Sequence, residues 1–368
     1  MNASTIKCFN FVKEYESFSP HRTGGVGNGN VLSWLKNYLL SVGWNISSHE
    51  FNYKHYNSIL DSDDSNFKGM LLYYSVIGKG SLSNPLYYSL SDSTKIETGT
   101  QLEDQNIITL IGKLTKNAIA NANDCVVIES VSELGDLSAI NSSSDLNINF
   151  PIILVDGRTY KKFMNKRLLL SYDAWINESK TFNILAKSYS YDEQSPLVIT
   201  TPISGWFSCS GERGCGIAVA LEVAKEVSKF YPVDLVFANA HELGYQGAYE
   251  FVADYQNKPM AVLHLGSCLA NTDAEMISVC HSKNSKNIAL HLSKLGIFPK
   301  PPANNKLKKY WAGEAKCWSS KNVPMLSIAG ESAYFHTSAD VAKSVTNEEL
   351  LLNYVEYITK ATLALISR

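Results

Sequence analysis

The stretch from Leu197 to Val252, LVITTPISGWFSCSGERGCGIAVALEVAKEVSKFYPVDLVFANAHELGYQGAYEFV, contains the pattern that decides the fold. Two apolar runs of strand length, at 197–201 and 233–238, each lead into a turn rich in glycine and polar residues, and a helical pattern follows each turn. This order predicts a βαβ unit. Ligands of such sheets bind beyond the carboxyl ends of the strands. We therefore expect the turns at 205–215 and 239–245 to face one crevice.

Four acidic or imidazole side chains follow expected strands and belong at this edge of the sheet. Glu212 falls in a turn before a helix, His241 and Glu242 follow the second strand, and His336 follows a strand at 324–328. Two carboxylates and one imidazole form the ligand set of a catalytic zinc with an open fourth position. Such an ion lowers the pKa of a bound water to about 7, and a neutral His241 could accept the proton.

Each of these residues also has an ordinary structural interpretation. Glu212 could cap the following helix or pair with Arg213, and His336 could be a hydrogen-bonded core histidine. Cys209 and Cys215 flank the Glu212 turn and could act as thiol nucleophiles, although small buried cysteines are more common. The residues alone leave a metal site, a thiol site and a structural role open.

Common nucleophile and phosphate-binding motifs do not occur in the sequence. GERGCG, at 211–216, has its glycines in the order GxxGxG, which is neither the dinucleotide fingerprint nor a phosphate loop, and there is no GxSxG elbow. HELGY, at 241–245, opens like a zincin helix, but Tyr245 stands where the second histidine belongs. These motif families are excluded.

Composition and charge limit the partners of the chain. The 368 residues are 45% hydrophobic and 18% charged, with a formal net charge of -2 and no basic run, so we expect neither nucleic acid nor membrane as a partner. No segment has the apolar core of a signal peptide or the roughly 18 apolar residues of a membrane helix. The 7 scattered cysteines fit reduced thiols. We expect a cytoplasmic protein with a small-molecule or peptide substrate, and the oligomeric state stays open.

The pattern of expected helices and strands divides the chain into two compact units. A chain of this length also favours two units over one. In residues 1–54 the expected elements are a helix, a glycine-rich loop, a second helix and a strand, at 6–15, 17–30, 31–42 and 44–51. Short β-type runs between 55 and 179, among them 107–111, predict a small β-rich domain with one or two helices. Residues 180–368 have the βαβ pattern, which ends with an amphipathic packing helix at 347–366.

A series of motifs runs through most of the chain: HRTGG, WLKNYLLSVGW, FNILAKS, LVITTPISGWF, GERGCGIAVALEVA, VFANAHELGYQGAYEFV, KNVPMLSIAG and YFHTSADVAKSV. Their order and spacing resemble the zinc aminopeptidase superfamily, which includes bacterial leucyl aminopeptidases, glutamate carboxypeptidase and glutaminyl cyclases. The resemblance implies a three-layer α/β domain of the phosphorylase/hydrolase-like kind, with a mixed central sheet, formed by residues 1–54 and 180–368. It implies that residues 55–179 are an inserted β-rich domain similar to the protease-associated domain.

The peptidases of this superfamily hold two zinc ions through a His in an HxD motif, a bridging Asp, a Glu, a second Asp and a second His. Here Pro202 occupies the position of the first His, and Gly266 occupies the position of the second Asp. Both ligands that bind only one of the two metals are therefore absent. The resemblance matches Glu212 to the bridging Asp, Glu242 to the Glu and His336 to the last His. These three residues are therefore expected to hold a single zinc ion.

The resemblance also suggests roles for the residues around this metal. The first Glu of the family's EE pair is the general base, and His241 takes its place as the expected catalytic proton shuttle. Glu314 falls where the family often has an Asp before the last strand. Trp206, Arg213 and Glu314 are the expected substrate-binding residues. Glutaminyl cyclases use a similar one-zinc set to close an amino-terminal glutamine onto its own amine.

Three interpretations of the function remain open. The first is a divergent metallopeptidase-like enzyme with at most one zinc, which acts on an amide bond of a small or amino-terminal peptide substrate by hydrolysis or by cyclase-like intramolecular transfer. The second is a catalytically inactive aminopeptidase-like protein that binds a peptide or metabolite without metal. Chemistry that uses His241 with Cys209 or Cys215 is a third possibility.

Overall fold

A mixed sheet of eight strands forms the centre of the computed structural model, which describes residues 7–90, 104–146, 148–164, 166, 168–188, 195–274, 276–294, 311 and 313–367. The strand order is β1-β7-β9-β8-β10-β12-β11, and β3 pairs with β7. Neighbours among β8, β9, β10 and β12 are parallel, whereas β7 and β11 run antiparallel to their neighbours. The mixed central sheet is confirmed. Its strands are β1 Asn45–Ser62, β3 Gly78–Leu82, β7 Leu170–Lys187, β8 Leu197–Pro202, β9 Val233–Ala238, β10 Ala261–Leu265, β11 Met276–His281 and β12 Met325–Glu331.

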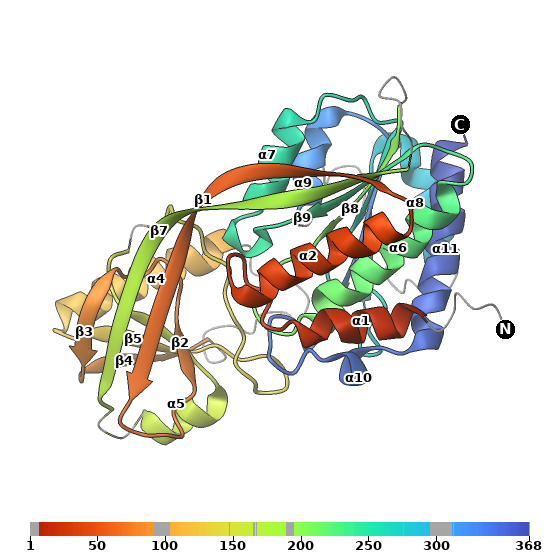
Figure 1. Ribbon diagram of the computed structural model, residues 1–368. Coiled ribbons are helices and arrows are strands. Elements are labelled where there is room, and N and C mark those ends of the chain that lie inside the picture. The colour runs from red at the N-terminus through yellow and green to blue at the C-terminus, as the bar shows by residue number, and fades with distance from the viewer. Residues whose placement is uncertain are drawn as a thin grey trace.

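Helices cover both faces of this sheet and give three layers (Figure 1). Side chains alternate between the faces along each strand, so Ile199 and Leu235 join the core under α1, α2, α6, α8 and α11, whereas Val198 and Val236 join the core under α7 and α9. None of the described helices is both long and apolar enough to cross a bilayer. The helices are α1 Lys7–Ser17, α2 Val26–Ser41, α6 Cys215–Val227, α7 Gln246–Asp254, α8 Lys286–Lys294, α9 Ala315–Trp318, α10 Ala342–Val345 and α11 Glu348–Ile366.

The glycine-rich segment before residue 31 is partly helical, because α2 begins at Val26. A Cβ atom on Gly27 would lie 2.0 Å from the carbonyl oxygen of Phe18 and 2.2 Å from that of Pro20. Gly27 therefore allows the first turn of α2 to pack directly against the preceding chain. The expectation of a loop at 26–30 is wrong, since close backbone approach and not a turn requires glycine here.

A second, smaller sheet has the strand order β2-β6-β5-β4 and its own core, and this inserted unit lies between β1 and β7 in the sequence. The expected β-type run at 107–111 lies within α4, so that expectation is wrong. Ile111, Leu114 and Ala118 have helical spacing and are buried together, and this period of 3.6 decides the conformation. The elements of this unit are β2 Gly69–Leu71, β4 Pro85–Ser89, α4 Asp104–Ala120, β5 Cys125–Glu129, β6 Ile152–Val155 and α5 Gly157–Phe163.

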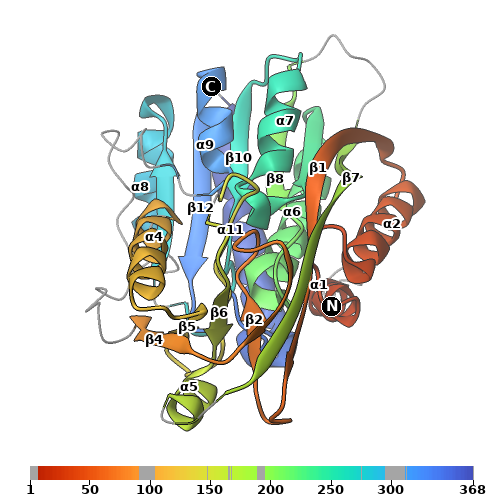
Figure 2. The same ribbon diagram turned by 90° about the vertical axis from the view of Figure 1, so that its left-hand side faces the viewer.

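The strands β1 and β7 connect the two units. They pair without interruption from Asn45↔Lys187 to Ser62↔Leu170, and Figure 1 shows both strands running from the main sheet into the smaller unit. The expected boundaries at 54/55 and 179/180 fall inside this ladder. Figure 2 places the smaller unit near the end toward which β12 points, which is the carboxyl edge of the parallel strands.

Candidate functional site

Ser204 joins three of the predicted residues at the carboxyl ends of β8 and β9. Its hydroxyl donates to Glu242 Oε2 at 2.7 Å and accepts from the backbone N–H of His241 at 3.0 Å. Its carbonyl oxygen accepts from Arg213 Nε at 2.9 Å. The two predicted turns therefore meet at one edge of the sheet. The sequence alone gave no signal for this linking role of Ser204.

Four residues in the segments that carry the site have backbone conformations in the left-handed region. Cys209 and Ala240, with φ of 49° and 58°, directly precede the short helices Ser210–Gly214 and His241–Leu243. Tyr245 and His336 have φ of 65° and 58°. Such a conformation costs a non-glycine residue of order 1–3 kcal/mol and persists only where the surroundings impose it. The fold thus holds both turns in strained geometry.

Glu212 forms an ion pair with the residue that follows it. Arg213 Nη2 lies 2.6 Å from Glu212 Oε1, and each side chain is only 1% exposed. Burial by itself would raise the pKa of the Glu212 carboxyl, but the Arg213 guanidinium and His336 outweigh that effect and lower it to about 2. Glu212 therefore stays ionised in the buried site, and its charge is balanced by Arg213.

His336 is held between Glu212 and the inserted unit. Its Nε2 lies 3.2 Å from Glu212 Oε1, and its Nδ1 lies 3.0 Å from the carbonyl oxygen of Ala139. A carbonyl oxygen can only accept, so Nδ1 carries a proton. The backbone N–H of Ala139 in turn donates to the His336 carbonyl oxygen at 3.0 Å. Two hydrogen bonds from the inserted unit thus fix the position of this imidazole.

Thr23 and Asp340 form hydrogen bonds with Glu242 and Glu212, respectively, and sequence reasoning missed both. The Thr23 backbone N–H donates to Glu242 Oε1 at 2.6 Å, so both carboxylate oxygens of Glu242 already accept hydrogen bonds. Asp340 accepts from the backbone N–H of Glu212 at 2.9 Å. Thr23 belongs to HRTGG and Asp340 to the motif that contains His336, so the motifs themselves were the available signal.

His241 and Glu314 form a buried pair, with 2.9 Å between Nδ1 and Oε1. Burial raises the pKa of the Glu314 carboxyl to about 8, although Arg213 acts in the opposite direction. Burial, followed by the charge of Arg213, holds the pKa of His241 well below its usual range. Both groups are therefore neutral near pH 7 and share one proton in their hydrogen bond. The His241 side chain is 10% exposed and is the part of the pair that reaches the surface.

Glu314 should make stability depend on pH between about 6.5 and 8. The unfolded carboxyl ionises near 4.5, but the folded one keeps its proton up to about 8, so the folded state binds more protons and loses stability as pH rises. Folded His241 is neutral throughout this window, and its unfolded imidazole, half protonated near pH 6.5, contributes only a smaller change of opposite sign. We expect the free energy of unfolding to fall by at most about 2 kcal/mol from pH 6.5 to 8 through Glu314. Urea denaturation of the wild type and of Glu314→Gln at both pH values measures this contribution, and equal slopes in the two proteins would contradict it.

The arrangement does not fit the single zinc ion expected from the sequence. Glu212 already faces a guanidinium, and a divalent cation at the same carboxylate would be repelled by that charge. Both oxygens of Glu242 accept hydrogen bonds from Thr23 and Ser204. Within the described parts of the chain, no group of three or more His, Cys, Asp or Glu side chains could hold a metal ion. A zinc site at Glu212, Glu242 and His336 would first require Arg213 to move away.

Trp206, an expected substrate-binding residue, lies in the hydrophobic core of the inserted unit. Its Nε1 donates to Asn141 Oδ1 at 2.8 Å, and its ring meets Tyr73 edge-on with 4.5 Å between centroids. Asn141 and Tyr73 both belong to residues 55–179. In this structure Trp206 therefore links the two units at the carboxyl edge of the sheet.

The thiols beside Glu212 are poorly suited to nucleophilic chemistry. Burial raises the pKa of Cys209 well above its usual value, and burial also raises that of Cys215. Only the thiolate is a strong nucleophile. Cys209 instead directs its thiol toward Glu212 Oε2 at 3.6 Å. The geometry gives no support to the alternative that pairs His241 with a reactive cysteine.

No protein-family model matches the sequence, and no curated protein matches it. Solved structures do match. A zinc aminopeptidase from Bacillus subtilis has a TM-score of 0.74 at 12% identity, with 98% of this chain and 94% of that chain covered. The chain has the zinc-aminopeptidase fold. A peptidase M28 precursor from Shewanella amazonensis SB2B gives a TM-score of 0.71 at 14% identity, with 98% and 93% covered. An aminopeptidase from Aneurinibacillus sp. strain AM-1 gives 0.64 at 14% identity, also with 98% and 93% covered.

Proposed function

We propose that this chain is a zinc-aminopeptidase-fold protein that binds a peptide or a small metabolite at the carboxyl edge of its sheet without a catalytic metal. The observation that carries this proposal is the buried ion pair between Glu212 and Arg213. Glu212 is the acidic residue nearest to His336 in this site, and its charge is already balanced from within the protein. The losses at Pro202 and Gly266 agree with such a function, since neither side chain can bind a metal.

Aromatic and basic side chains surround the exposed part of this site and would contact the ligand. The ring of Tyr245 meets His241 edge-on with 4.7 Å between centroids, and Lys316 Nζ lies 4.3 Å from the centre of the Tyr245 ring. Phe335 stacks on His336 with 3.8 Å between centroids. Imidazoles flanked by aromatic rings can pack on a peptide and exchange hydrogen bonds with its amides. This surface therefore suits a short peptide or an amide-bearing metabolite.

Amide chemistry without a metal is a second candidate function, and the His241–Glu314 pair favours it. Glu314 engages Nδ1 of His241, which leaves Nε2 to accept or donate a proton. Hydrolysis and intramolecular amide transfer both need such a proton shuttle. This candidate keeps the catalytic role expected for His241 but removes zinc from it. Turnover in the presence of a chelator distinguishes it from simple binding.

His241→Ala should weaken peptide binding at least about tenfold, because it removes the one site imidazole that pairs with Glu314 and meets the surface. The measurement is calorimetric titration of a series of dipeptides and amino-acid amides into protein dialysed against EDTA. Tyr249→Ala, an exposed substitution on α7, is the matched control and should bind like the wild type.

The same protein is then assayed with leucyl and glutaminyl coumarin amides. The proposal predicts binding that EDTA does not change and no turnover. Turnover that persists in EDTA and is lost in His241→Ala would show that the function is metal-free catalysis and not binding alone. Turnover that requires added zinc would contradict both candidates.

A further inference from the structure

Arg22 lies at the junction of the main domain and the inserted unit, just before α2. Figure 1 shows the first turn of α2 at the end of that helix nearest to the smaller unit. Nη2 of Arg22 donates to the carbonyl oxygen of Tyr56, and its guanidinium carbon lies 3.6 Å from the centre of the Tyr73 ring. A carbonyl oxygen and an aromatic face thus hold this charged group in one position before any ligand binds.

Most of the hydrogen-bond donors of Arg22 are unused. A guanidinium carries several N–H groups and no acceptor, and within the described chain the contact with Tyr56 is the one hydrogen bond that this side chain makes. Its Nε and Nη1 have no partner there and are not enclosed, since the residue is only half-buried. These donors therefore reach the surface, where an oxyanion can accept from them.

Arg22 keeps its positive charge at this junction. Burial lowers the pKa of its guanidinium to about 10, so the group stays protonated at pH 7. Glu242 is the carboxylate that acts most strongly on it, but Glu242 is 1% exposed and accepts from Thr23 and Ser204. Among the described residues no carboxylate forms an ion pair with Arg22. The first turn of α2 has no side-chain cap and adds its positive end to this charge.

His55, on β1, supplies a second donor beside the same loop. A Cβ atom on Gly24 would lie 2.9 Å from its Cε1 and 3.0 Å from its Nδ1, so the ring packs directly against the loop before α2. Burial, followed by the charge of Arg22, lowers the pKa of His55. The imidazole is therefore neutral at pH 7 and carries one N–H. It is half-buried, and its ring makes no hydrogen bond within the described chain.

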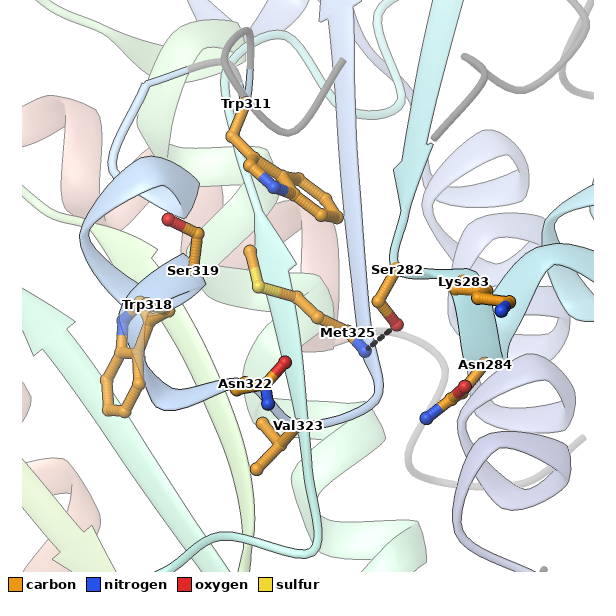
Figure 3. A pocket seen from close by; sticks show the side chains of 9 residues that line it. All are labelled: Ser282, Lys283, Asn284, Trp311, Trp318, Ser319, Asn322, Val323 and Met325. Atoms are coloured by element: carbon orange, nitrogen blue, oxygen red, sulfur yellow. Dashed lines mark hydrogen bonds between the residues drawn. The ribbon is translucent and has the colours of Figure 1, made fainter. Parts of the chain in front are cut away.

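The cavity at the amino end of β12 offers no comparable group. It has a volume of about 170 Å³, and Trp318 and Met325 belong to its wall (Figure 3). These two residues are only 1% and 2% exposed, so they present little surface to a ligand. The charged residue among the described residues that line the cavity is Lys283, which is exposed. The fold therefore positions a charge at Arg22 and not at this cavity.

We propose that Arg22 and His55 form a binding site for a small oxyanion, the phosphate or carboxylate group of a metabolite, at the junction of α2 and β1. The oxyanion accepts hydrogen bonds from the unused donors of Arg22 and from the ring N–H of His55. The proposal does not rest on the ligand proposed for His241, because neither side chain belongs to that site.

Nuclear magnetic resonance of the arginine Nε–H groups tests the proposal with inorganic phosphate and acetate as probes. The chain has 5 arginines, and Arg22→Lys identifies the resonance of Arg22 by its loss. At least one probe should move this resonance with a dissociation constant below about 5 mM, whereas chloride at the same ionic strength should not. Tighter binding of phosphate assigns the site to a phosphorylated ligand, and tighter binding of acetate assigns it to a carboxylate. Dissociation constants above about 5 mM for both probes, or an equal shift with chloride, would overturn the proposal.

His55→Phe provides a second variant in which the Arg22 resonance is still present. Phenylalanine keeps a ring against Gly24 but removes the N–H donor, so the affinity for the tighter probe should fall at least about threefold. His49→Phe, a half-buried position on the same strand that pairs with Asp254, is the matched control and should bind like the wild type. Unchanged affinity in His55→Phe, or equal losses in both variants, would refute the assignment of the site to His55 and Arg22.

Discussion

Arg213→Met is expected to lower the free energy of unfolding by about 3–5 kcal/mol, because it leaves the Glu212 carboxylate buried without its partner. Methionine keeps most of the apolar length of the side chain, so packing contributes little to the loss. Urea denaturation at pH 7 measures the effect. The size of the loss reports whether the guanidinium is the group that neutralises this acidic residue.

Two further variants make the Arg213 result specific. The double variant Glu212→Gln/Arg213→Met removes both charges and should recover at least half of the lost stability. Arg158→Met, at an exposed position of α5, should change stability by no more than about 0.5 kcal/mol. A loss below about 1 kcal/mol in Arg213→Met would mean that Glu212 is balanced by something other than Arg213.

Trp206→Ala is expected to cost about 3–5 kcal/mol, the usual range for removing a buried tryptophan from a core. The substitution also removes the hydrogen bond to Asn141 and the contact with Tyr73, which join the inserted unit to the carboxyl edge of the sheet. Backbone hydrogen exchange at Ala139, whose N–H donates to His336, should therefore become faster. Urea denaturation and exchange of the same sample measure the two effects.

The controls for Trp206 separate its hydrogen bond from its packing. Trp206→Phe keeps a ring but leaves the Asn141 oxygen without its donor, so a loss of about 1–3 kcal/mol is expected. Trp175→Ala, on the exposed side of β7, should cost less than about 1 kcal/mol. Unchanged exchange at Ala139 in Trp206→Ala would show that the inserted unit holds His336 without help from Trp206.

The main sheet was predictable because its signals are local. The apolar runs at 197–201 and 233–238 are buried on both faces, as continuous apolar strands in parallel sheets are. Because these two strands are parallel, the turns that follow them lie at the same carboxyl edge of the sheet. The segment around Gly27 was predicted poorly, because its glycine is required by contact with Phe18, and composition does not distinguish that cause from a turn.

The proximity of the candidate site residues was predictable from motifs, but their pairing was not. The sequence placed Glu212, His241, Glu242 and His336 at one edge of the sheet. The sequence alone could not decide whether Arg213 contacts a substrate or pairs with Glu212. The two residues are neighbours in the sequence, and this adjacency is compatible with either contact. The supports from Thr23 and Ala139 come from positions more than 190 residues away from their partners in sequence, and no local pattern reveals such contacts.

Metal analysis of protein purified without chelator tests the central claim most directly. If Arg213 occupies the charge-balancing role beside Glu212, the protein should contain less than about one tenth of an equivalent of zinc, and added zinc should not raise its melting temperature. His336→Ala is the matched variant and should contain the same small amount. About one equivalent of zinc in the wild type, lost in His336→Ala, would contradict the metal-free account and restore the single-zinc site.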